Sequence, residues 1–179
     1  LPPRHDEGRV VQVGADDGHL LQARGLEVLA ALDKAREAFS PDGLVSEEAG
    51  VRQRAADFIK QGAETAARLG ATSLIGPFCA PVGQLLGRRR TEDEWSRAVE
   101  GLRSIVPTLE ACGVTLANGP LNRFETYFLN TCADARRLCD EVGSPRHGVL
   151  FDTFHANIEE KTAGAAIDAL GGRMAHVHA

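Results

Sequence analysis

Short apolar runs alternate along the chain with longer segments in which apolar residues recur every three or four positions. Five of the runs are apolar on consecutive residues, as expected of parallel strands that are covered on both faces. They lie at residues 26–32, 72–78, 114–117, 148–152 and 174–178. Helical periodicity extends from Ser46 to Gly70 and through residues 91–112, 131–142 and 162–170, and residues 19–23 are predicted to end one more helix. This alternation of strand and helix predicts an α/β fold with a parallel sheet.

Residues that favour helix ends stand at the borders of the two longest helical segments. Ser46 precedes two glutamates, and Thr91 is followed three positions later by Glu94, which is the spacing of a capping box. Gly70 and Gly113 follow the last apolar positions of these segments, where glycine commonly ends a helix. Both segments are therefore predicted to be complete helices with defined ends.

The order of the elements fits two architectures: an open doubly wound sheet and a closed (β/α)8 barrel. No Gly-x-Gly-x-x-Gly follows any predicted strand, which argues against a dinucleotide site of the Rossmann type. A full barrel takes about 250 residues, whereas this chain has 179. Five strands would make about five eighths of such a barrel.

Composition and charge narrow the classes of partner. Hydrophobic residues make up 43% and charged residues 25% of the chain, which is typical of a folded globular protein. The formal net charge is −5, so no overall positive field favours nucleic acid or an anionic membrane. No apolar run approaches the roughly 18 residues that span a bilayer. We expect neither nucleic acid nor membrane as a partner, and we expect a cytoplasmic location.

The N-terminus and the cysteines agree with a cytoplasmic protein. The first residues have no signal-peptide character, and the only methionine is Met174, so we expect the chain to start inside a longer gene product. The four cysteines form no Cys-x-x-Cys pair, which argues against zinc-ribbon and thioredoxin sites. Buried, reduced thiols are therefore expected.

Polar residues gather where three of the predicted strands end. Glu125 follows the third strand, Asp152 and His155 follow the fourth, and His176 and His178 close the fifth. Ligand sites of parallel α/β folds collect at the carboxyl ends of strands, and carboxylates with histidines suit a divalent metal. Strand alternation puts His176 and His178 on the same side. A helix cap for the carboxylate and a core position for each histidine remain the alternatives.

Two charged clusters are interpreted as structural. Glu159, Glu160 and Lys161 are predicted to form a solvated helix start. Arg88–Arg90 are predicted to lie in an exposed loop, with phosphate binding as the less favoured alternative.

Several longer stretches resemble a known family. The chain resembles the sugar phosphate isomerase/epimerase family with xylose-isomerase-like barrels, and within it the ketose 3-epimerases of the D-tagatose/D-psicose type. The resemblance is close over residues 114–179 and loose before them. It implies a (β/α)8 TIM barrel that is incomplete at both ends, with residues 1–179 as one partial barrel domain. The stretches that carry it are Pro-Leu-Asn-Arg-Phe-Glu at 120–125, Leu-Asn-Thr at 129–131, Asp-Thr-Phe-His-Ala-Asn-Ile-Glu-Glu at 152–160 and His-Val-His at 176–178.

The resemblance also implies a metal site held by two glutamates, one aspartate and one histidine. The matching aspartate and histidine are Asp152 and His178, whereas Glu125 and His155 match positions that bind substrate hydroxyls. The first metal glutamate falls six residues before Glu125, where this chain has Gly119. The second belongs to an eighth strand, which is expected beyond the end of the chain. No catalytic residue is therefore assigned, and Mn²⁺ or Co²⁺ is expected ahead of Mg²⁺ or Zn²⁺.

The function implied by the resemblance is metal-dependent epimerisation of a ketose at C3 through an enediolate. A hydroxypyruvate or sugar-phosphate isomerase of the same barrel type, and a non-catalytic sugar-binding protein that lost its glutamate at Gly119, remain the alternatives. The expected partner is a small sugar or sugar phosphate, and homo-oligomerisation stays open. Because strands are missing, we also expect the barrel to be completed by further residues or by a partner.

Overall fold

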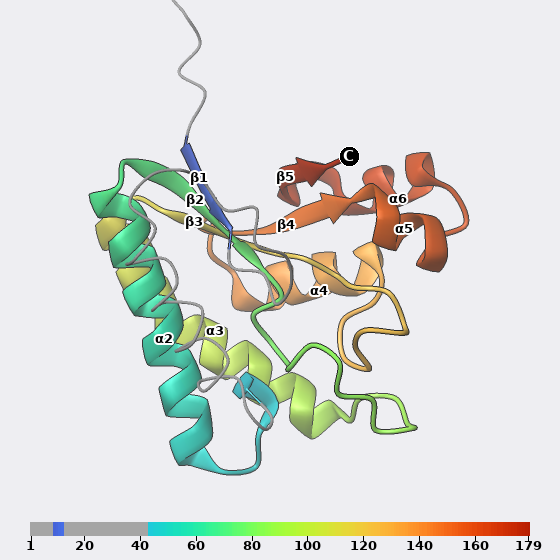
Figure 1. Cartoon of the computed structure of the whole chain (residues 1–179), viewed down its shortest axis with the longest axis horizontal. Helices are drawn as coiled ribbons and strands as arrows, with labels where there is room; N and C mark the ends of the chain where they lie inside the picture. The colour runs from blue at the N-terminus through green and yellow to red at the C-terminus, as the bar shows by residue number, and fades with distance from the viewer. Residues whose placement is uncertain (1–8, 13–42) are drawn as a thin grey trace, which may run out of the picture.

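A five-stranded parallel sheet is the frame of the protein (Figure 1). The structure, a computed structural model, describes residues 9–12 and 43–179. The strands pair in sequence order, and every neighbouring pair is parallel. They are β1 (Arg9–Gln12), β2 (Ala71–Gly76), β3 (Thr115–Asn118), β4 (His147–Asp152) and β5 (Met174–His178). A doubly wound sheet reverses its strand order, so sequential order identifies consecutive strands of a barrel.

Helices connect the strands, and α2, α3 and α4 lie on one side of the sheet (Figure 1). The helical elements are η1 (Gly43–Val45), α2 (Ala49–Arg68), α3 (Glu92–Cys112), α4 (Cys132–Val142), α5 (Thr153–Glu159), α6 (Ala163–Leu170) and η2 (Gly171–Arg173). The predicted capping box is confirmed, because the Thr91 hydroxyl accepts from the Glu94 backbone N–H and the Glu94 carboxylate accepts from the Thr91 N–H. Gly113 then ends α3 in the left-handed conformation, with φ of 68°.

Most residues of β2, β3 and β4 are buried, as their continuous apolar runs predict, whereas Met174, Ala175 and Val177 of β5 are exposed. On the helix-covered face, Leu74, Leu116, Val149 and Phe151 join the main core. On the opposite face, Ile75, Ala117 and Leu150 form a separate buried cluster, which is hereafter called the inner cluster. Because side chains alternate along a strand, Gly119 and Asp152, two positions after Ala117 and Leu150, belong to the inner face as well.

Four of the five predicted strands are confirmed, with borders that shift by one or two residues. The predicted strand at 26–32 and the helix end at 19–23 lie outside the described residues. Four elements were not predicted: the four-residue β1, the seven-residue α5 and the short helices η1 and η2. The seven residues of α5 bury only Ala156, so they carry no apolar stripe that periodicity could reveal.

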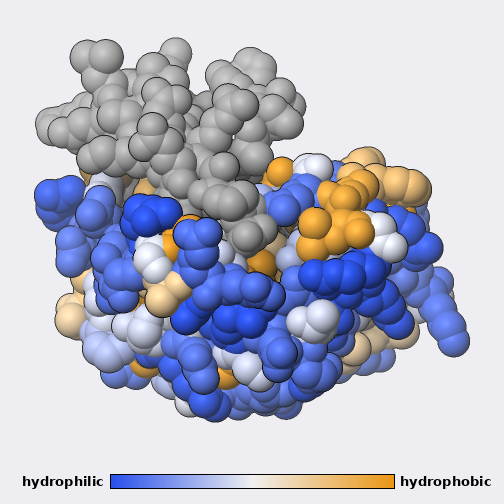
Figure 2. Space-filling model, turned by 90° about the horizontal axis from the view of Figure 1, so that it is seen from below, coloured by the Kyte–Doolittle hydropathy of each residue, from blue (hydrophilic) through white to orange (hydrophobic). Residues whose placement is uncertain are grey.

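Within the described residues the surface is mainly polar. Figure 2 shows one largely hydrophilic face that carries a compact apolar area. No helix among residues 43–179 is long and apolar enough to cross a bilayer. All four cysteines are free thiols, of which Cys79, Cys132 and Cys139 are buried, as expected.

Trp95 on α3 anchors the loop that follows β3. Its side chain is 1% exposed, and its ring stacks on Phe128 of that loop with centroids 6.0 Å apart. The indole N–H donates to Glu141 Oε2 at 2.9 Å. The guanidinium groups of Arg90 and Arg137 lie 4.6 and 4.4 Å from the ring centroid. Apolar burial, a hydrogen bond and two cation–π contacts thus hold the loop against α3 and α4.

The arginine cluster before α3 lies in a loop in which Arg88 and Arg89 are exposed, as predicted, whereas Arg90 is not. The Arg90 side chain is only 15% exposed and pairs with Asp134 at 2.9 Å. Arg88 is half exposed, yet both its terminal nitrogens bond the Glu94 carboxylate, which lowers the pKa of Glu94 to about 2. Arg88 thus pairs with a residue of α3, and Arg90 pairs with a residue of α4.

Replacing the anchor should destabilise the fold. We expect Trp95→Ala to lower the free energy of unfolding by about 3–5 kcal/mol, because it removes a fully buried aromatic side chain and leaves a cavity. The measurement is equilibrium unfolding in urea followed by circular dichroism. Lys60→Gln on α2 serves as the control and should cost less than about 1 kcal/mol, because its ion pair with Asp57 lies at the surface. A Trp95→Ala loss no larger than the control's would contradict the anchoring role.

Candidate functional site

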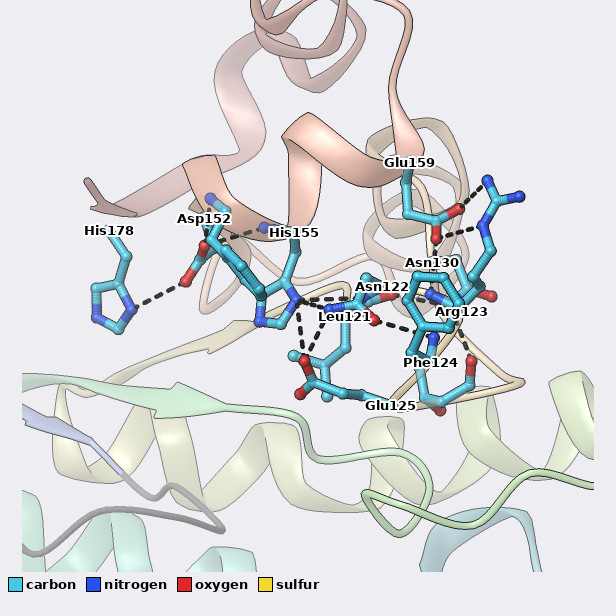
Figure 3. A network of polar contacts seen from close by, with 12 residues as sticks. Leu121, Asn122, Arg123, Phe124, Glu125, Asn130, Asp152, His155, Glu159 and His178 are labelled. Atoms are coloured by element: carbon cyan, nitrogen blue, oxygen red, sulfur yellow. Dashed lines mark hydrogen bonds and ion pairs between the residues drawn. The ribbon is translucent and has the colours of Figure 1, made fainter.

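The last residues of β4 and β5 bring a carboxylate and an imidazole together. Asp152 and His178 are paired in the parallel register of these strands. Asp152 Oδ2 lies 3.4 Å from His178 Nδ1, and the two side chains are 18% and 30% exposed (Figure 3). The structure therefore places the two predicted metal-binding side chains side by side at the carboxyl ends of neighbouring strands.

The second oxygen of Asp152 caps α5. Asp152 Oδ1 accepts hydrogen bonds from the backbone N–H groups of Phe154 at 2.8 Å and His155 at 3.3 Å. The helix-cap interpretation of this carboxylate is thus correct for one oxygen, while the other oxygen faces His178. The cap restricts rotation of the carboxylate and so holds Oδ2 toward β5.

The separation of the two atoms suits a shared divalent ion. Two ligands that each lie about 2.1 Å from one ion at a tetrahedral angle are about 3.4 Å apart. Aspartate oxygen and neutral imidazole nitrogen are also accepted by Mn²⁺, Co²⁺ and Zn²⁺. Among residues 43–179, however, no third His, Cys, Asp or Glu side chain joins them in a metal-binding group. The described residues therefore fit a metal only as two of its ligands.

Gly119 lies where another ligand would start. A Cβ built on Gly119 would lie 3.1 Å from Leu150 Cδ2, on the inner face that also carries Asp152. Its neighbour Asn118 offers no substitute, because Asn118 Oδ1 accepts from the Phe78 N–H at 3.0 Å and its amide N–H bonds Cys79 Sγ. A side chain at Gly119, directly after β3, would therefore start on the inner face beside Leu150.

Glu125 and His155 form a second polar group, joined through Asn122. His155 Nδ1 lies 3.8 Å from Glu125 Oε1. The Asn122 side-chain amide donates to Glu125 Oε1 at 2.7 Å and lies 2.9 Å from His155 Nδ1. The contacts run from His178 through Asp152 and His155 to Glu125 (Figure 3).

The hydrogen bonds assign the tautomer of His155. The backbone N–H of Asn122 can only donate, and it points at His155 Nδ1 from 3.1 Å. Nδ1 is therefore the acceptor, and the proton of the neutral ring is on Nε2. An N–H donor on His155 and a carboxylate acceptor on Glu125 thus belong to one group.

Asn122 is a site residue that the predictions missed. It is 2% exposed, and its Oδ1 accepts from the Phe124 N–H at 2.9 Å, which folds the loop into a turn. Asparagine before a turn is common, so its type alone gave no reason to place it between Glu125 and His155. The only hint in the sequence was that Asn122 lies in one of the stretches that resemble the family.

Glu159 and Glu160 correct the prediction of a solvated helix start. They lie at the end of α5, and the Glu159 side chain is 6% exposed. Its carboxylate accepts from the Arg123 backbone N–H at 2.6 Å and from the guanidinium at 2.9 and 3.0 Å. Burial alone would raise the pKa of Glu159, but the bonds from Arg123 lower it. Glu160 accepts from the Cys132 N–H at 2.7 Å, so both carboxylates fix loops around the site.

His176 lies beside His178 on β5, as alternation predicts, with ring centroids 5.3 Å apart. Burial lowers the pKa of His176, and the neighbouring His178 lowers it further. His176 thus favours the neutral form next to the Asp152–His178 pair.

Proteins of known name are similar to this chain in sequence. The chain is 46% identical over 83 residues to a D-psicose 3-epimerase of Enterocloster bolteae, which covers 46% of this chain and 28% of the relative. It is 34% identical over 138 residues to an L-ribulose 3-epimerase of Mesorhizobium japonicum, covering 76% of this chain and 46% of the relative. The chain thus spans less than half the length of these two curated relatives.

Solved structures agree. A crystal structure of a D-psicose 3-epimerase in the presence of D-fructose matches with a TM-score of 0.71 and 31% identity, over 76% of this chain and 48% of that one. An L-ribulose 3-epimerase matches with a TM-score of 0.75 and 25% identity, over 94% and 58%. The profile of the family described as xylose isomerase-like TIM barrel matches residues 17–179. Together with the sequential parallel sheet, this match shows that the chain belongs to the xylose isomerase-like TIM barrel family.

Proposed function

We propose that this chain carries the part of a ketose epimerase site in which Asp152 and His178 hold a divalent metal ion. The observation that carries the proposal is the 3.4 Å approach of Asp152 Oδ2 to His178 Nδ1 at the carboxyl ends of β4 and β5. The names of the relatives, D-psicose 3-epimerase and L-ribulose 3-epimerase, support a ketose as the substrate class. The resemblance implies Mn²⁺ or Co²⁺ ahead of Mg²⁺ or Zn²⁺, and a site with oxygen and nitrogen donors accepts such divalent ions.

In this proposal Glu125 and His155 bind hydroxyl groups of the sugar. The Glu125 carboxylate accepts from a hydroxyl, and the Nε2–H of His155 donates to one. Asn122 keeps the two groups at a fixed separation, so a polyhydroxylated ligand meets a prearranged donor and acceptor. When bound, the metal would stabilise negative charge on the ketose oxygens as the neighbouring C–H proton leaves.

Gly119 favours a second candidate function, sugar binding without turnover. Epimerisation removes a proton on one face of a carbon and returns one on the other, which requires two acid/base groups. A glycine supplies none at the position that would point toward Asp152. In this candidate the chain binds metal and sugar but exchanges no proton.

Metal titration tests the proposed ligands. We expect His178→Gln and Asp152→Asn each to weaken Mn²⁺ binding by more than about tenfold. Replacing even a residue that only hydrogen-bonds to a metal ligand commonly lowers metal affinity by about tenfold or more. The measurement is isothermal titration with Mn²⁺ at neutral pH. His176→Gln is the matched control, since it makes the same change two positions earlier on β5 and should leave the affinity within about twofold.

The outcome separates a metal site from a simple hydrogen-bonded pair. If His178→Gln binds Mn²⁺ as tightly as the original chain, Asp152 and His178 are no metal ligands. If His176→Gln weakens binding as much as His178→Gln, the effect belongs to the fold of β5, and the assignment of His178 fails.

Restoring a carboxylate at position 119 tests the two candidate functions against each other. We expect Gly119→Glu, made in a full-length version that carries the expected eighth strand, to raise both Mn²⁺ affinity and D-psicose epimerisation, because general acid/base groups contribute about 10²–10⁴-fold to rate. Leu150 must move by a few tenths of an ångström to admit the new side chain, which its flexible end allows. Gly119→Gln is the control, because it has the same size without the charge. The measurement combines Mn²⁺ titration with an assay of ketose epimerisation.

Three results are informative. Activity in Gly119→Glu alone supports an epimerase site that lacks its carboxylate. Equal activity in the glutamate and glutamine variants would contradict a proton-transfer role at this position. Full activity of the chain with glycine in place would show that the missing ligand has been assigned to the wrong residue, and Glu125 would then be the carboxylate to test.

A further inference from the structure

A cavity of about 390 Å³ lies at the opposite end of the sheet from Asp152 and His178. Its walls include the first residues of three strands, namely Thr115 of β3, His147 of β4 and Met174 of β5. Arg136 of α4 and Arg173 of η2 complete the polar part of the lining. The volume lies in the range of small-molecule sites, and none of these residues belongs to the site described above.

His147 lines this cavity without a hydrogen-bond partner for its ring. The residue is 2% exposed, and neither Nδ1 nor Nε2 is bonded to any described residue. Burial, together with a smaller effect of the nearby Arg173, lowers the pKa of His147 to about 4, so the ring is neutral at pH 7. A neutral imidazole has one N–H donor and one acceptor. Leaving both unpaired in a buried place is costly, and this indicates a polar occupant of the cavity.

The two arginines give the cavity an excess of positive charge. Arg136 bonds Asp140 Oδ2 and the Leu170 carbonyl, and Arg173 bonds Asp140 Oδ1 and the Ser144 carbonyl. These bonds use two of the five N–H donors of each guanidinium. Two cationic groups thus share one carboxylate, and the remaining donors are not engaged within residues 43–179.

We propose that this cavity binds a small oxyanion, a phosphate or carboxylate group, between Arg136, Arg173 and His147. Guanidinium donors match the oxygens of such groups in geometry and charge. The neutral His147 ring adds an N–H donor from the floor of the cavity. An anion would also offset the second arginine charge, which Asp140 leaves unbalanced.

Other occupants fit these groups less well. A metal cation would be repelled by the two guanidinium groups, which have no lone pair to offer. A neutral polyol could bond His147 but would leave the arginine charge uncompensated. Water alone could satisfy the imidazole, and the experiment below includes this outcome.

The probe is inorganic phosphate, added to the full chain at constant ionic strength with chloride as the balancing ion. The measurement follows the ¹H–¹⁵N resonances of the imidazole rings by NMR. We expect the His147 resonances to shift saturably with phosphate and not with chloride. Arg173→Gln and Arg136→Gln should each weaken this binding by about tenfold or more, because each removes charged hydrogen bonds to the anion.

Asp140→Asn is the matched control. It breaks the same ion pairs with Arg136 and Arg173 as the arginine variants do but keeps both guanidinium groups. We expect it to bind phosphate at least as tightly as the original chain, since the competing carboxylate is gone. Circular dichroism of each variant confirms that it is folded. If Asp140→Asn loses as much phosphate binding as the arginine variants, the arginines have only a structural role. This result would overturn the proposal.

Three further outcomes would also overturn it. A His147 shift that is identical for phosphate and chloride would leave water as the occupant. A larger saturable shift with D-fructose than with phosphate would identify a polyol site. Binding of phosphate in every variant with unchanged affinity would exclude the arginines as its ligands.

Discussion

The parallel register of β4 and β5 is the constraint on which the candidate site depends. It sets Asp152 opposite His178 at the carboxyl ends of both strands, so that one carboxylate oxygen faces an imidazole nitrogen. The other oxygen caps α5 and thereby positions His155 one turn away. A shift of this register by one residue would turn one of the two side chains to the opposite face of the sheet. The pairing of β4 with β5, the cap of α5 and the approach of Asp152 to His178 therefore depend on one another.

The loop after β3 adds the second half of the site, and it is held from three directions. Asn122 bonds both Glu125 and His155, Arg123 is clamped by the buried carboxylate of Glu159, and Phe128 stacks on Trp95. The contacts of Asn122 and Arg123 reach α5, and that of Phe128 reaches α3, and both helices are distant from the loop in sequence. The loop therefore needs no regular secondary structure of its own to present Glu125 in a fixed place.

The sequence predicts the parts of this arrangement that follow from local rules. Continuous apolar runs predicted four strands, and the spacing of Thr91 and Glu94 predicted a helix start. Both predictions were possible because they depend on residues that are close together in the sequence. Asp152 and His178 followed from strand ends that meet at one edge. In contrast, Glu159 is buried by a partner 36 residues away, and no charge pattern near it could show that. Asn122 and His147 were missed for the same reason, since their roles depend on distant strands and loops.

Gly119 lies on the inner face beside Leu150, where we propose that a carboxylate ligand is missing. The inner cluster and the Asp152–His178 pair are in place beside it. We propose that Asp152 and His178 are ligands of one ion. The direct test is anomalous diffraction from crystals grown with Co²⁺. The account predicts one peak about 2.0–2.2 Å from both Asp152 Oδ2 and His178 Nδ1. A peak elsewhere with none between these two atoms would contradict it.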